Sequence, residues 1–288
     1  MNRIIILLIL SLIMQSCHKE LLPAEYIVVE GWIESGQGPV VILTKSFVVA
    51  EKGDIKQSGD ANSVVLPWGK VTVTDGTDTI VLTGGIDKNY YPSYVYKSDH
   101  IIGEPGGTYK LQVEYGDNIL TATTTIPLRD SLEAVKVERI NEKTYQINAY
   151  FNDDPSNKDY YMFFTKLHGK ETRYYPSFLG LFDDDMLSLN NSCQVFPGIH
   201  TLTDSVYEYS SYYEKGDSVL FKFAKIDRTT YEIHKSYNDI VALASNPVFV
   251  SDLELKTNII GGLGFWCGYA ATDYRVVISD SIKTQESD

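Results

Sequence analysis

The feature that most constrains the fold is an alternation of inward-pointing, mostly apolar side chains with polar ones between residues 109 and 126. Two alternating runs lie on either side of a Gly116-Asp117 turn, and Pro127 ends the second run. The positions expected to point inward are Tyr109, Leu111, Val113, Tyr115, Leu120, Ala122, Thr124 and Ile126. A period of two is typical of half-buried antiparallel strands, so this segment predicts a β-hairpin over a core.

Further strand patterns precede this hairpin. YIVVEGWI from Tyr26 and VVILTKSF from Val40 are rich in β-branched residues. KVTVTDGTDTIVL carries Asp75-Gly76 between two such runs, which is a hairpin signal because these residue types accept the backbone of a tight turn. We therefore predict that residues 26–127 form one all-β domain, an immunoglobulin- or transthyretin-like sandwich.

The second half repeats the strand pattern and adds one helix. KTYQINAYF alternates, and YYMFFTKL and SVLFKFAKI are further strand patterns, whereas residues 170–216 look irregular. A helix is expected at about 229–244, where Thr229 and Glu232 have capping-box spacing. The fold class is therefore mostly β, with two antiparallel β domains. The second would be a β-rich domain over residues 128–280 with one clear helix, followed by a tail over 281–288.

The first residues resemble a bacterial lipoprotein signal. Arg3 precedes an apolar run, Ile4 to Met14, and the small residue Ser16 stands directly before Cys17. The run is shorter than the roughly 20 residues that span a bilayer, which favours a cleaved signal. We expect a signal peptide over 1–16, lipid on Cys17, and a lipidated tether over 17–25. The expected location is the outer membrane, facing either the periplasm or the cell surface.

Composition narrows the classes of partner. The net charge is −13, and no cluster of Lys and Arg appears, so nucleic acid is excluded as a partner.

Besides Cys17, the chain holds Cys193 and Cys267. They could form one disulfide in an oxidising compartment or remain two buried thiols, and the sequence leaves both open.

The order of these signals resembles a known family. After the cysteine come, in order, YIVVEGWI, VVILTKSF, EPGGTYKLQV, TTTIP, FNDDPSNKDYYMFF, the helix at Thr229, SNPVFV and NIIGGLGFWCGYA. This series is similar to domain of unknown function 4249, a family of lipoproteins of Bacteroides-like bacteria. Its members are often encoded beside a TonB-dependent outer-membrane receptor. The resemblance implies a location and a receptor partner, and it transfers no catalytic residue.

A search for reactive groups identifies no catalytic residue, metal site or cofactor. Histidines are single, and no HExxH occurs. Asp183-Asp184-Asp185 is expected to be a solvated acidic loop, because three adjacent carboxylates should not converge on one ion. The glycines of Gly261-Gly262-Leu263-Gly264 are expected to permit a tight bend into a closing strand. We therefore predict a protein that is not an enzyme.

The 21 tyrosines suggest a recognition surface. They cluster at 90–96, 173–176 and 207–213, and tyrosine combines a rigid apolar face with a polar tip. The alternative is that tyrosine is simply common in strands. The candidate contacts for an unknown small ligand are Tyr174, Tyr175, Tyr209, Tyr212 and Tyr213.

Two functions follow from these patterns. The leading hypothesis is a non-enzymatic outer-membrane lipoprotein that assists a TonB-dependent transporter in nutrient capture or uptake. The alternative is a fimbrial or adhesive subunit that polymerises by strand donation after proteolysis.

Five Asp-Ser or Asp-Thr pairs, at 78, 130, 204, 217 and 280, also resemble the O-glycosylation signal of Bacteroides-like exported proteins.

Overall fold

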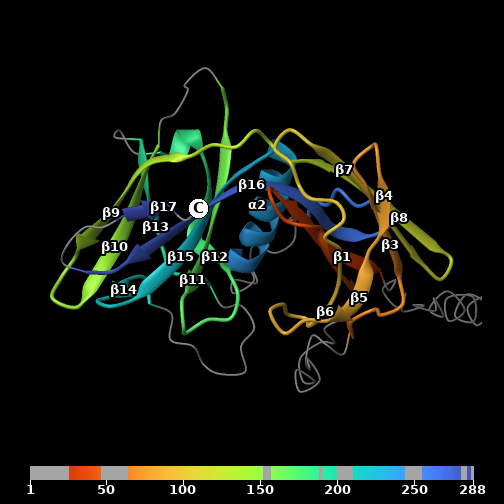
Figure 1. Ribbon diagram of the computed structural model, residues 1–288, viewed down its shortest axis with the longest axis horizontal. Coiled ribbons are helices and arrows are strands. Elements are labelled where there is room, and N and C mark those ends of the chain that lie inside the picture. The colour runs from red at the N-terminus through yellow and green to blue at the C-terminus, as the bar shows by residue number, and fades with distance from the viewer. Residues whose placement is uncertain are drawn as a thin grey trace, which may run out of the picture.

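The computed structural model describes residues 26–46, 64–151, 157–187, 191–199, 210–243, 255–279 and 284–286. The signal peptide and tether, Cys17 included, lie outside these residues. The described part is mostly β, with several antiparallel sheets and the single α-helix α2 (Arg228–Leu243) (Figure 1). None of the described helices has the length and apolar character needed to cross a bilayer.

One nine-stranded sheet runs through both halves of the chain. Its strand order is β12-β11-β15-β16-β1-β2-β6-β5, with β17 added to β16. The bounds are β1 (Ile27–Glu34), β2 (Val40–Lys45), β5 (Thr83–Ile86), β6 (Tyr94–Lys97), β11 (Tyr160–Leu167), β12 (Tyr175–Asp183), β15 (Ser218–Ile226), β16 (Leu263–Val277) and β17 (Thr284–Glu286). The expected irregular stretch 170–216 thus contains β12, and the expected tail contains β17.

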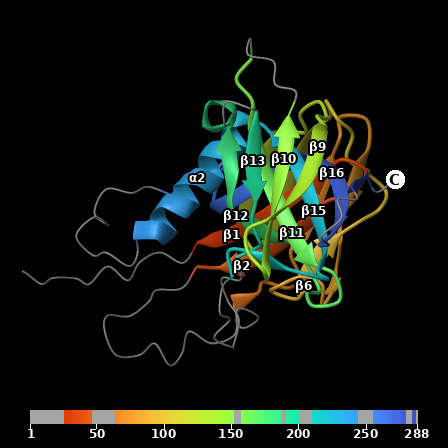
Figure 2. The same cartoon turned by 90° about the vertical axis from the view of Figure 1, so that its left-hand side faces the viewer.

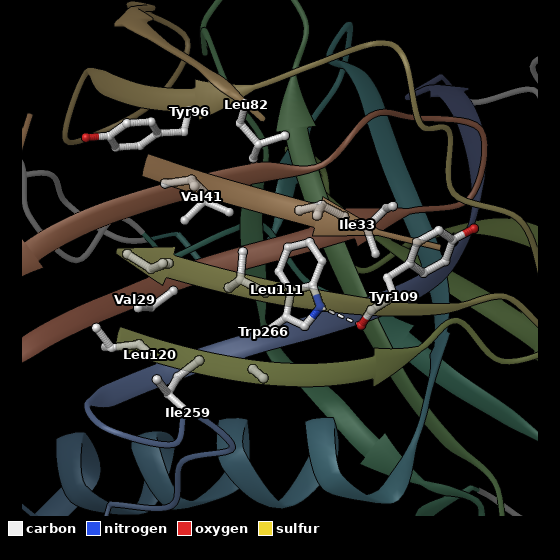
Figure 3. Packing of buried hydrophobic residues seen from close by; sticks show 14 of the residues in the cluster. Val29, Ile33, Val41, Leu82, Tyr96, Tyr109, Leu111, Leu120, Ile259 and Trp266 are labelled. Atoms are coloured by element: carbon white, nitrogen blue, oxygen red, sulfur yellow. Dashed lines mark hydrogen bonds between the residues drawn. The ribbon is translucent and has the colours of Figure 1, made fainter. Parts of the chain in front are cut away.

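A second sheet packs on the part of the long sheet formed by β1, β2, β6 and the start of β16. It has the order β4-β3-β7-β8, with β3 (Lys70–Thr74), β4 (Thr79–Val81), β7 (Thr108–Tyr115) and β8 (Asn118–Thr125). The predicted hairpin is confirmed, because Tyr109, Leu111 and Val113 are buried and Gly116 forms the turn with positive φ. Figure 3 shows this core, in which the buried indole of Trp266 donates a 3.0 Å hydrogen bond to the backbone oxygen of Tyr109.

A third sheet packs on the part of the long sheet formed by β11, β12, β15 and the end of β16. It consists of β13 (Ser192–Val195), β10 (Thr144–Phe151), β14 (Tyr213–Glu214) and β9 (Leu132–Arg139). The alternation predicted in KTYQINAYF is confirmed, since Tyr145, Ile147, Ala149 and Phe151 are all buried. They pack against aromatic side chains of β11 and β15 in a second core cluster.

Strand β16 belongs to both halves. Its start pairs with β1 in parallel, and its end pairs antiparallel with β15. Trp266 and Ala270 enter the first core, whereas Tyr274 and Val276 enter the second. We call the second sheet, together with the strands that it packs on, the first sandwich. A domain boundary at residue 127 does not describe the packing, because Trp266 and Ala270 complete the core of this sandwich.

Gly264 makes the parallel contact between β1 and β16 possible. Its φ is +104°, and a Cβ placed there would lie 1.9 Å from the backbone oxygen of Val29. Only glycine fits so close to a neighbouring backbone at positive φ. The predicted tight bend lies just before β16, at Gly261, whose φ is +90°.

Helix α2 packs on the face of the long sheet opposite the two covering sheets, as the side view also shows (Figure 2). Cys267 and Tyr269 point to this face, alternating with Trp266 and Ala270 on the other. The helix begins one residue earlier than expected, because Asp227 caps it: its Oδ1 accepts a 2.7 Å hydrogen bond from the Thr230 backbone N–H. The predicted Thr229 cap is wrong, and Glu232 instead pairs with Arg228 and Lys256.

Candidate functional site

Two tyrosine-rich segments that lie far apart in the sequence meet in the structure. The guanidinium of Arg173, just before β12, lies 5.3 Å from the ring centre of Tyr91 and 5.0 Å from that of Tyr175. Tyr91 belongs to the loop between β5 and β6, in the other half of the chain. Arg173 therefore joins the two halves through cation–π contacts.

A group of charged residues continues this contact across the sheet. Lys222 on β15 and Asp273 on β16 are cross-strand neighbours, and Lys222 Nζ donates to Glu34 Oε1 at the end of β1, at 2.5 Å. The same Nζ lies 4.9 Å from the ring centre of Tyr174, whose hydroxyl donates a 3.3 Å bond to Asp273 Oδ1. We call the set Tyr91, Arg173, Tyr174, Tyr175, Lys222, Glu34 and Asp273 the junction cluster.

The electrostatics of the junction cluster come from partial burial. Desolvation raises the pKa of the Glu34 carboxyl, and the Lys222 ammonium acts in the opposite direction. Burial, followed by the neighbouring Asp273 carboxylate, raises the pKa of the Tyr174 hydroxyl above its usual range. Tyr174 is therefore a neutral hydrogen-bond donor at neutral pH, not a base.

The composition of the junction cluster suits recognition. Tyrosine and arginine carry much of the binding energy in protein interfaces, because they combine large contact area with fixed polar groups. Tyr91, Arg173, Tyr174 and Tyr175 are all half-buried, so each is held in place and keeps some accessible surface. A hollow of about 490 Å³ lies beside the same loop, where Lys97 Nζ contacts Asp87 Oδ2 at 2.7 Å.

The five tyrosines singled out from the sequence separate into different environments. Tyr174 and Tyr175 belong to the junction cluster. Tyr213 is only 1% exposed and lies in the second core, so its selection as a surface contact is wrong. Tyr212 is 40% exposed and lies outside the junction cluster, and Tyr209 falls outside the described residues.

Sequence reasoning missed the charged members of the junction cluster. Arg173 directly precedes the Tyr174-Tyr175 pair, and that adjacency is a usable signal. No local sequence pattern indicates Glu34, Lys222 or Asp273, because only the pairing of β1, β15 and β16 brings them together.

The two described cysteines are free thiols, so the disulfide alternative is not present in the structure. Cys193 lies on β13, packed against the second core, whereas Cys267 lies beneath α2. Burial raises the pKa of both thiols, that of Cys267 to about 12. Both are therefore neutral at pH 7 and poor nucleophiles.

The three adjacent carboxylates do converge, contrary to expectation. Asp183, Asp184 and Asp185 each place an oxygen within 4.8 Å of the others. Lys158 Nζ occupies the centre, contacting Asp184 at 2.7 Å, Asp183 at 3.4 Å and also Asp185. An ammonium group thus occupies the position that a metal cation would take.

His234 is the one histidine among the described residues that packs between α2 and the long sheet. Its Nε2 lies 2.7 Å from the Tyr269 hydroxyl, and its ring packs 5.3 Å from Phe265. Desolvation lowers the pKa of His234 to about 4, so the imidazole is neutral. This arrangement fixes the helix on the sheet.

Comparison with known proteins gives one family. The profile of the family described as a domain of unknown function (DUF4249) matches residues 18–275, which is most of the chain. A search of curated proteins found no match.

Proposed function

Because the chain belongs to the DUF4249 family, we propose that it is a non-enzymatic outer-membrane lipoprotein. It would be anchored through lipid on Cys17 and would assist a TonB-dependent transporter in nutrient capture or uptake. The single observation that carries this proposal is the apolar run that ends at Ser16-Cys17, at the length and position of a lipoprotein signal. More than one acyl chain on a cysteine gives stable anchoring.

The junction cluster supports the recognition part of the proposal. It combines half-buried aromatic rings with Arg173 and Lys222, and it lies where the two halves of the chain meet. Contacts between halves are common places for ligand sites. We propose that this cluster contacts the transporter or its small ligand.

Chemical reactivity has little support in the described part of the chain. The thiols of Cys193 and Cys267 have raised pKa values, and His234 is a neutral packing group. Cys193 packs against the second core, whereas Cys267 and His234 both lie beneath α2, where each contacts the Tyr269 hydroxyl. Burial raises the pKa of Tyr269 well above its usual value, so this hydroxyl is neutral as well. We propose binding, not catalysis, on this basis.

Two substitutions test the proposal separately. Cys17→Ser should release the chain from the membrane fraction, and retention in that fraction would contradict the anchor. Arg173→Ala should lower the amount of receptor that co-purifies with the chain, because it removes the guanidinium that contacts the rings of both Tyr91 and Tyr175. The matched control is Arg139→Ala on the hairpin between β9 and β10, where the guanidinium bonds backbone oxygens instead.

The fimbrial alternative meets a specific difficulty. Strand donation requires a missing strand, and the first strand would have to leave. β1 lies between β16 and β2, and its Val29 and Ile33 are fully buried in the first core. Ladders of the chain on unboiled gels would revive this alternative.

A further inference from the structure

One end of the first sandwich carries a ring of exposed apolar side chains. Tyr26 stands directly before β1 and exchanges hydrogen bonds with Ser46, just after β2. Ile260 forms a bridge with Thr121 near the start of β8, and Gly261 lies against the backbone oxygen of Ile119. These contacts place Tyr26, Ile119 and Ile260 at the same end.

Trp68 completes the ring. Its neighbour Gly69 bonds the Tyr96 hydroxyl and lies beside Tyr115, which closes the turn before Ile119. The exposed fractions around this end are 49% for Tyr26, 89% for Trp68, 64% for Ile119 and 73% for Ile260. We call these four residues the tether-end ring.

Trp68 is unusual in two independent ways. It is almost fully exposed, although tryptophan gains more than most side chains from burial. It also has a φ of +72°, a backbone conformation that bulky residues rarely adopt. Residues held in such sparsely populated backbone conformations cluster at functional sites.

The position of the tether identifies the occupant. Residues 18–25 separate Cys17 from Tyr26, so an extended tether reaches about 30 Å at roughly 3.5 Å per residue. Lipid on Cys17 would therefore keep Tyr26 within about 30 Å of the bilayer. Tryptophan and tyrosine favour the boundary between acyl chains and headgroups, because they combine an apolar ring with a polar atom.

We propose that the tether-end ring is a membrane-contact face, with Trp68 inserted at the lipid interface. The proposal rests on the proposed lipid anchor at Cys17. Contact with the bilayer fixes the orientation of the sandwich relative to the membrane, and the junction cluster lies beyond the far end of β1.

The test uses the full mature chain on phosphatidylcholine vesicles with brominated acyl chains, which quench nearby tryptophan. Trp68 is one of three tryptophans, and Trp266 is buried and Trp32 half-buried. We expect brominated vesicles to remove about one third of the tryptophan emission, and Trp68→Phe to abolish that loss. Circular dichroism confirms that each variant is folded.

Leu128 offers a matched control at the opposite end of the same sandwich. Its side chain is 73% exposed and lies beside Gly106. Gly103, three residues before Gly106, lies against the backbone of Glu34 at the end of β1, which places Leu128 at that end of the sandwich. In the Trp68→Phe chain, Leu128→Trp should give a tryptophan that brominated lipid does not quench. Quenching at both positions would show non-specific adsorption and would overturn the proposal.

Intact-mass measurement of Cys17 separates the possible failures. An acylated chain that binds vesicles without quenching of Trp68 overturns the membrane-contact face and leaves the anchor standing. A chain without acyl groups whose Trp68 is still quenched supports the face and overturns the anchor. A chain that is neither acylated nor quenched overturns both.

Discussion

Substitution of Gly264 by alanine should break the contact that joins the two halves of the chain. A Cβ at this position would lie 1.9 Å from the backbone oxygen of Val29 and 2.9 Å from its nitrogen. The strand pair β1 and β16 would have to separate by roughly 1 Å or more, because Cβ contacts under about 3 Å are too close for van der Waals packing. The residue would also keep a φ near +104°.

The expected loss can be estimated from these contacts. The left-handed backbone costs roughly 1–2 kcal/mol once a Cβ is present. One or two lost ladder hydrogen bonds add about 1 kcal/mol each. Displacement of the buried Val29 adds a similar amount, so we expect the free energy of unfolding to fall by about 3–5 kcal/mol, a large share of the typical 5–15 kcal/mol.

Gly85→Ala on the edge strand β5 is the matched control. No atom lies within 4 Å of a Cβ built there, and no positive φ constrains it. This variant should change stability by less than about 1 kcal/mol, with stabilisation the expected direction. Urea unfolding followed by tryptophan fluorescence measures both variants. Equal midpoints for Gly264→Ala and the unchanged chain would refute the account of β16 as the shared strand.

Three further changes test the packing and the charges. Tyr213→Ala should lower the free energy of unfolding by about 3–5 kcal/mol, because its ring is buried. Tyr212→Ala should lower it by less than about 1 kcal/mol, because Tyr212 is exposed. Urea unfolding of the two variants decides whether Tyr213 belongs to the core. His234 has its pKa lowered from 6.5 to about 4, so its neutral form is favoured in the folded state and its stabilisation is lost as the pH falls from 6.5 through 4. His234→Asn should flatten that part of the stability–pH curve, and an unchanged slope would contradict the assignment. Burial raises the pKa of Glu30, so its ionised form is disfavoured in the folded state and its contribution to stability declines as the pH rises above 4.5. Glu30→Gln should therefore stabilise the chain at pH 7, and thermal unfolding at pH 7 and pH 4 should show the gain only at the higher pH.

Local pattern accounts for much of the fold. The alternation around Gly116 predicted β7, β8 and their inward residues, because burial on one face imposes a period of two. The helix was located to within one residue. Its cap was misassigned because Asp227 and Thr229 are both good capping residues, and only the backbone geometry distinguishes them.

Long-range pairing was beyond the reach of local pattern. The parallel contact between β1 and β16 joins residues that are more than 200 positions apart, and neither strand signals its partner. The junction cluster depends on that pairing, so only its tyrosines and the adjacent Arg173 had a local signal. Lys158 likewise meets the three aspartates only after β11 and β12 are aligned.

The most direct measurement of the proposed function is affinity purification of the native chain from detergent-solubilised outer membrane, with mass spectrometry of the proteins that accompany it. We expect a TonB-dependent receptor in stoichiometric amount, and a chain that carries lipid on Cys17. Recovery of the chain alone, or only with further copies of itself, would contradict the proposed role as a transporter accessory.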